Sequence, residues 1–129
     1  MKALPVFALL LAIGCAQAPA QNNQAMQPSA GGADAAQQAL MDRIERDVRL
    51  PEGAGALATY ARYYAWQQRP DGARKVVAVW QNLTGEPPAR HWVTERGFPV
   101  IMDGGCGVVS LTWDVATQRI EHIACNGEA

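Results

Sequence analysis

The sequence has no run of basic residues and, after its first fifteen residues, no long apolar segment. Its eleven Lys and Arg residues are scattered and nearly balanced by twelve Asp and Glu residues. The basic patch typical of a nucleic-acid-binding protein is therefore missing, and we expect no nucleic-acid partner. No later apolar run reaches the roughly 20 residues that a membrane-spanning helix requires, so we expect no membrane-spanning helix after residue 15.

Residues with metal-binding or acid–base chemistry are few and poorly grouped. His91 and His122 have no short i, i+2 or i, i+4 partner, which argues against a metal site. No two carboxylates are convincingly paired for acid–base catalysis. Asp103 and Asp114 stand beside turns, where such side chains cap backbone N–H groups. The sequence therefore predicts no metal and no cofactor.

The first fifteen residues have the pattern of an export signal. Lys2 precedes an apolar run over residues 3–13, which is too short to span a bilayer and suits the hydrophobic region of a secretory signal peptide. Residues 12–15, which end in Cys15, resemble the lipobox of bacterial lipoproteins. That resemblance implies cleavage just before Cys15 and a lipid on this cysteine. Because Ala16 is not Asp, it also implies sorting to the outer membrane.

Three cysteines are an odd number for an exported protein. If Cys15 carries lipid, Cys106 and Cys125 remain as one pair in an oxidising compartment, where disulfides persist. The alternative is ordinary signal cleavage after the A-x-A sequence at residues 18–20, which would remove Cys15 and leave the same pair. We therefore expect a Cys106–Cys125 disulfide with either cleavage.

Cys106 is also the candidate nucleophile of an alternative function, an envelope thiol enzyme that uses a histidine, for example on peptidoglycan. Its Gly-Cys step is similar to that of the L,D-transpeptidases. Their Ser-His-Gly-Cys-x-Arg motif, however, requires a His and an Arg where this chain has Gly104 and Val108. The sequence favours the structural disulfide over the nucleophile.

We expect three parts along the chain: a signal peptide at residues 1–14, a lipid-anchored tether at 15–33 and a globular domain at 34–129. Residues 16–33 contain no charge and too little apolar surface to offset their ordering entropy, which predicts a disordered tether. The domain is small enough for one disulfide to contribute usefully to its marginal stability.

The domain is expected to begin with an amphipathic helix. Asp34 and Gln37 have the spacing of a capping box. The apolar positions recur at helical spacing: Leu40, Met41, Ile44 and Val48. Two acid-before-base pairs at i, i+4 are expected on the other side: Asp42 with Arg46 and Glu45 with Arg49. The helix should end near Leu50, because a residue before proline disfavours helical dihedrals.

Residues 57–66 fit either a helix or a strand. The Pro-Asp-Gly turn at 70–72 and the apolar run at 75–81 favour a hairpin, so we expect residues 60–66 to be extended and to pair with 75–81. Residues 90–94 are expected to add a short strand. The pattern predicts an α+β fold, with the N-terminal amphipathic helix packed on a small antiparallel sheet of about four strands and one disulfide.

The last two β-rich runs, residues 107–113 and 118–125, should form a hairpin. If Trp113 pairs with Gln118, Cys106 lies directly opposite Cys125, and disulfide reach and the apolar pattern favour the same register. The register places Ala124 and His122 on the apolar face together with Val109, Leu111, Trp113 and Ile120.

Tyrosine and tryptophan are abundant for such a small domain. Trp80 and Trp113 are expected in the core, whereas Tyr63 and Tyr64 should point to opposite faces of a strand. An exposed aromatic patch would suit a protein or glycan partner in the envelope. The candidate residues for this interaction surface are Tyr60, Tyr63, Tyr64, Trp66 and Trp92.

Residues 60–65, 102–106 and 125–127 resemble segments of small uncharacterised lipoproteins of Gram-negative bacteria. The resemblance implies an exported module and no particular activity. The sequence thus predicts a non-enzymatic envelope lipoprotein that acts as an interaction or structural module. We expect the lipid on Cys15 to anchor it in the outer membrane, facing the periplasm.

Overall fold

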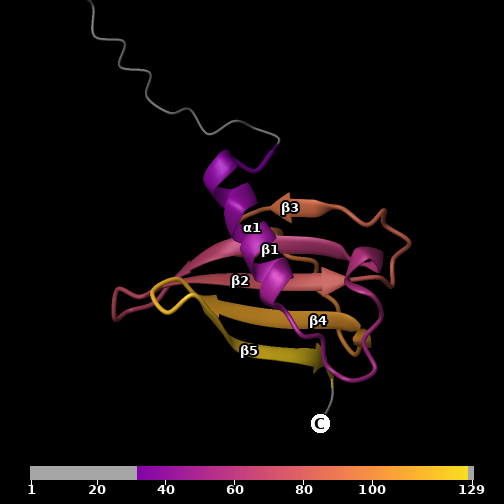
Figure 1. The fold of residues 1–129 in the computed structure, drawn as a ribbon. Helices are drawn as coiled ribbons and strands as arrows, with labels where there is room; N and C mark the ends of the chain where they lie inside the picture. Colours follow the sequence, from indigo (N-terminus) through magenta and orange to yellow (C-terminus); the bar gives the residue numbers. More distant parts are fainter. Residues whose placement is uncertain (1–31, 128–129) are drawn as a thin grey trace, which may run out of the picture.

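The computed structural model describes residues 32–127 (Figure 1). The proposed signal peptide, Cys15 and all but the last two residues of the proposed tether lie outside this range. Ala33 packs against the hydrophobic core, so the folded domain includes the end of the segment assigned to the tether. No helix among residues 32–127 is both long enough and apolar enough to cross a membrane.

One helix, α1 (Ala35–Asp47), packs against one face of a five-stranded mixed sheet (Figure 1). The strands lie in the order β3-β1-β2-β4-β5. Their bounds are β1 Ala61–Gln68, β2 Arg74–Gln81, β3 Arg90–Trp92, β4 Gly105–Asp114 and β5 Arg119–Asn126, and two short 3₁₀ turns occupy Leu57–Thr59 (η1) and Glu95–Gly97 (η2). The expected α+β class is confirmed.

Two finer expectations about the fold are wrong. The sheet has five strands instead of about four, and it is mixed, because the edge strand β3 runs parallel to β1 while the other neighbouring strands are antiparallel. The helix begins at residue 35, directly after the Asp34 cap, so it lies at the start of the expected domain and not at the N-terminus of the chain.

The capping box of α1 is confirmed. The Asp34 carboxylate accepts the Gln37 N–H at 2.8 Å, and the Gln37 side chain accepts the Asp34 N–H at 2.9 Å. Met41 and Ile44 are fully buried against the sheet. The helix ends at Asp47, before the expected Leu50.

The acid–base pairs expected along α1 are replaced by pairs between the helix and the sheet. Asp42 pairs with Arg90 of β3 at 2.5 Å, and Glu45 pairs with Arg62 of β1 at 3.0 Å. The Tyr64 hydroxyl donates to the same Glu45 carboxylate at 2.7 Å. These acidic side chains meet basic partners because they lie near the packed face of the helix, a tertiary effect that helix spacing does not reveal.

The first hairpin is confirmed. Strands β1 and β2 pair antiparallel along their whole length, with Tyr64 opposite Ala78. Gly72 takes a positive φ of 81° in the connecting turn, as expected for the Pro-Asp-Gly sequence. The expected strand starts late, because residues 57–59 form η1 and β1 begins at Ala61.

The face of the sheet that meets α1 carries the core. Its fully or almost fully buried members are Tyr64, Val76, Ala78, Trp80, Val109, Leu111 and Trp113. Residues 93–104, which connect β3 to β4, lie against the opposite face: Gln67 of that face donates to Glu95 at 2.9 Å, and Gly104 lies against the Val108 side chain. The expected core positions of Trp80 and Trp113 are confirmed.

The register expected for the last hairpin is wrong, although the disulfide that it was meant to explain is present. Asp114 pairs with Arg119, and a bulge follows at Glu121, so Trp113 pairs with Ile120 but Thr112 pairs with His122. His122 and Ala124 therefore lie on the face opposite the core, and His122 is exposed. The four-residue turn lies one residue later than expected, at 115–118, and the Asp114 side chain accepts the Thr117 N–H there at 2.6 Å.

A second irregularity brings the cysteines together. Cys125 pairs with Val109, whereas the next paired position is Gly105 with Asn126, so residues 106–108 of β4 bulge out of the ladder. The bulge places Cys106 beside Cys125, with 4.5 Å between the Cα atoms. The disulfide is therefore reached through a distortion of the strand, which alternating patterns cannot anticipate.

Candidate functional site

The five aromatic residues proposed as an interaction surface are not all on the surface. Tyr60 and Tyr64 are fully buried, so assigning them to an exposed patch was wrong. Tyr63 is half-buried on the other face of the sheet, as alternation along β1 predicts. Trp66 and Trp92 are half-buried, and these two come together.

A groove with a volume of about 880 Å³ lies where Trp66 and Trp92 meet. The two indole rings have their centroids 5.3 Å apart and are inclined by 64°. One wall of the groove is the segment 93–96, which includes the first two residues of η2, and the other includes Gln37 of α1 and Gly32. The groove thus joins the edge of the sheet to the N-terminal end of the helix.

Parallel pairing of β3 with β1 creates this groove. Trp92 lies opposite Tyr64, next to Trp66 along the same face of β1. The N–H of Val93 donates to the carbonyl of Tyr64 at 2.8 Å, which fixes the end of β3. Both tryptophans therefore stand on paired strands, and such a framework positions a binding surface better than a loop would.

The charged groups near the two indoles are two arginines and one glutamate. The Arg74 guanidinium lies 4.2 Å from the centroid of a Trp66 ring, a cation–π contact. Arg96 lines the groove and is exposed. The Glu95 carboxylate, which also lines it, accepts a hydrogen bond from Gln67. Sequence reasoning missed these charged residues, because their proximity depends on the nonlocal pairing of β3.

Comparison of the chain with protein-family models, curated proteins and solved structures found no match. A function for this protein must therefore be inferred from the chemistry of its described residues.

A second polar cluster, which no sequence pattern predicted, lies on the opposite face of the sheet. The Tyr63 hydroxyl donates to Glu86, the Gln81 amide donates to the same carboxylate at 2.9 Å, and His91 stacks on Tyr63 at 4.7 Å. Burial and the bond to Glu86 raise the pKa of Tyr63 to about 12. The cluster fastens the segment between β2 and β3 to the sheet, and His91 belongs to β3, the short strand expected at residues 90–94.

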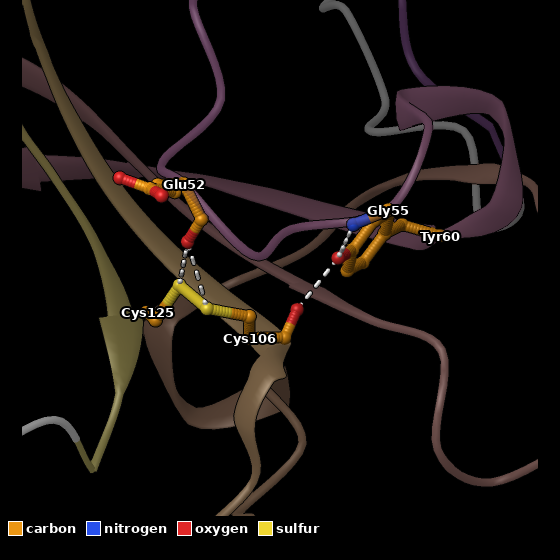
Figure 2. The surroundings of a disulfide bond; sticks show 5 residues. All are labelled: Glu52, Gly55, Tyr60, Cys106 and Cys125. Atoms are coloured by element: carbon orange, nitrogen blue, oxygen red, sulfur yellow. Dashed lines mark hydrogen bonds between the residues drawn. A yellow bond between two sulfur atoms is a disulfide. The ribbon is translucent and has the colours of Figure 1, made fainter.

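Figure 2 shows the disulfide between Cys106 of β4 and Cys125 of β5 with its neighbours. The buried Tyr60 hydroxyl donates to the carbonyl of Cys106 at 2.6 Å and accepts the Gly55 N–H at 3.0 Å. The carbonyl oxygen of Glu52 approaches the sulfur of Cys106 at 3.4 Å and that of Cys125 at 4.0 Å. Because both sulfurs are bonded to each other, the proposed thiol enzyme has no thiolate at Cys106 in this structure.

Metal ligands do not gather in the part of the chain that the structure describes. Within residues 32–127, no three His, Cys, Asp or Glu side chains lie close enough together to hold a metal ion. The groove formed by Trp66 and Trp92 suits a ligand, since ligand pockets combine apolar and aromatic walls with a few polar groups.

Proposed function

We propose that this protein is a non-enzymatic lipoprotein of the bacterial envelope, anchored by a lipid on Cys15, that binds a partner through the groove between Trp66 and Trp92. The observation that carries the proposal is the meeting of these two half-buried indoles, from β1 and β3, in a groove of about 880 Å³. Export and anchoring rest on the signal pattern at residues 1–15.

The size and composition of the groove support binding. Pockets that hold small molecules or parts of larger partners typically measure about 300–1,000 Å³ and are lined by aromatic side chains. Tryptophan is among the residues that contribute most to binding energy at interfaces. The groove also includes Gly32, so it lies beside the point where the domain joins the segment that leads to the proposed anchor.

A site-specific crosslinking experiment on the anchored protein tests this function. A photoreactive amino acid replaces Thr94, which is exposed and lines the groove, and in a matched variant it replaces Arg119, which is exposed on β5. We expect a crosslinked partner from position 94 but not from position 119, and its loss when Trp92→Ala is added. Crosslinks that form equally at both positions, or that persist with Trp92→Ala, would contradict the proposal.

The anchoring part has its own test. Cys15→Ala should abolish lipid modification and release the protein from the membrane fraction or leave it as an unprocessed precursor. Intact-mass measurement of a mature wild-type chain that begins at Gln21 without lipid would show that the anchor is wrong, while leaving the groove proposal untouched.

A further inference from the structure

We propose that the ligand of the groove is a glycan whose sugar carries a carboxylate group. This inference rests on the proposed function and specifies its ligand. Three features of the described residues support it: the aromatic walls, the distribution of charged partners around them, and the short strand that borders the groove.

The aromatic walls suit a sugar ring. A pyranose has one face lined by C–H groups and a periphery of hydroxyl groups, so it packs against an indole while its edge forms hydrogen bonds. Trp66 and Trp92 provide two indoles inclined by 64°, and Gln37 and Thr94 line the same groove with groups that donate and accept hydrogen bonds. The Gln37 oxygen is already engaged by the Asp34 N–H, so an apolar ligand would leave the Gln37 amide N–H groups and the Thr94 hydroxyl unused.

The charged groups indicate a negative ligand. The Glu95 carboxylate is the acidic group among the residues that line the groove, and its hydrogen bond from the Gln67 amide holds it toward the face of the sheet opposite the core. The guanidinium groups of Arg74 and Arg96, by contrast, form no ion pair with a carboxylate of residues 32–127. A guanidinium group binds a carboxylate through two parallel hydrogen bonds, which makes it a specific receptor for this group.

The backbone around the groove does not favour a peptide. A peptide that binds by adding a strand needs an extended sheet edge with alternating free N–H and carbonyl groups. Strand β3 has only three residues, Arg90–Trp92, and η2 follows shortly after it. An acidic peptide is therefore the less suitable occupant, and the experiment below includes it.

The four tryptophans provide a test with internal controls. Indole N–H signals of the whole protein are followed by NMR while N-acetylmuramic acid is added, and in parallel N-acetylglucosamine, which is the same sugar without the lactyl carboxylate. We expect the signals of Trp66 and Trp92 to shift and those of the buried Trp80 and Trp113 to stay. N-acetylmuramic acid should bind roughly tenfold more tightly, as expected for one charge-assisted contact.

Variants and two more probes identify the source of the preference. Arg96→Gln should reduce the preference for the acidic sugar, whereas Arg119→Gln, an equally exposed arginine on β5, should retain it. An equal response to glucuronic acid would extend the ligand class to acidic sugars in general. A response to N-acetylmuramic acid alone would restrict it to the acidic sugar of peptidoglycan. A Glu-rich peptide is the last probe.

Three outcomes would overturn the inference: no shift with either acidic sugar, equal binding of the acidic and neutral sugars, or a response to the acidic peptide alone. If the sugars fail but the crosslink at position 94 still depends on Trp92, the groove binds a different ligand and the proposed function stands. If that crosslink is also absent, both the proposed function and the proposed ligand are wrong.

Discussion

Replacing Cys106 and Cys125 together by Ala is expected to lower the free energy of unfolding by about 3 kcal/mol. The bond joins residues separated by 19 positions, so it closes a loop of about 20 residues in the unfolded chain. In the chain-entropy model such a loop restricts the unfolded state by roughly 11 cal/mol/K, which gives about 3 kcal/mol at 25 °C. Small domains have only about 5–15 kcal/mol in total, so the loss is large.

The native structure around the bond should survive the double substitution. The bulge at residues 106–108 is also fixed by hydrogen bonds that need no sulfur: the Tyr60 hydroxyl holds the Cys106 carbonyl at 2.6 Å, and the Asn82 N–H holds the Gly107 carbonyl at 3.0 Å. The effect should therefore act mainly through the unfolded state, which makes the chain-entropy estimate appropriate here.

Thermal and urea unfolding followed by circular dichroism check this prediction. The variant should melt about 12–24 °C below the wild type, from about 4–8 °C per kcal/mol for a domain of this size. A reducing agent should destabilise the wild type similarly and leave the variant unchanged, which serves as the control. A melting temperature within about 4 °C of the wild type would refute the reasoning, because it would place the loss below about 1 kcal/mol.

Three further results are expected. Glu45→Ala should lower the free energy of unfolding by about 2 kcal/mol, because it removes the acceptor of the Tyr64 hydroxyl in a largely buried network; urea unfolding measures this, and a loss under about 0.5 kcal/mol would contradict it. The Lys75 ammonium holds the pKa of Asp114 well below its usual range, so this carboxylate stabilises the fold above the pKa of an unfolded Asp, about 4, and the stabilisation disappears as the pH falls below that value. Asp114→Asn should therefore destabilise the protein at pH 7 and flatten its acid-unfolding curve, and an unchanged curve would exclude this role. Met102→Ser should change stability by less than about 0.5 kcal/mol in the same urea assay, since this side chain is 82% exposed, and a larger loss would reveal a contact there.

Local chemistry was sufficient to predict several elements. The capping box at Asp34, the Pro-Asp-Gly turn and the pairing of β1 with β2 all depend on residues close in sequence. The pairing of Cys106 with Cys125 followed from the count of cysteines in an oxidising compartment, although the register proposed for it was wrong. Such signals need no knowledge of the tertiary structure.

Nonlocal contacts account for what the sequence could not show. Strand β3 has three residues and finds its parallel partner in β1 across the whole first hairpin, and a strand this short carries almost no pattern of its own. At the bulge, the Glu121 carboxylate forms an ion pair with Lys75 of β2, at 2.6 Å. Each feature depends on a distant strand, so alternation along one hairpin gave the wrong face for His122.

The same limit applies to the candidate site. Aromatic density was enough to propose Trp66 and Trp92, but it could not separate them from Tyr60 and Tyr64, which have similar neighbours in sequence. Tyr60 turns inward because η1 precedes it and its hydroxyl finds the Cys106 carbonyl. The charged partners of the groove, such as Arg96, follow β3 and could be assigned only once its pairing was known.

The groove and the disulfide lie toward opposite ends of the sheet and on different strands, the groove on β1 and β3 and the disulfide on β4 and β5. Trp66 pairs with Val76 near the turn between β1 and β2, whereas Gln81, at the other end of β2, pairs with Val108 beside the disulfide. The length of β2 therefore separates the cysteines from the groove. The double-alanine variant should retain the ligand response of its groove at temperatures well below its melting point, so it separates the stability of the fold from the chemistry of binding.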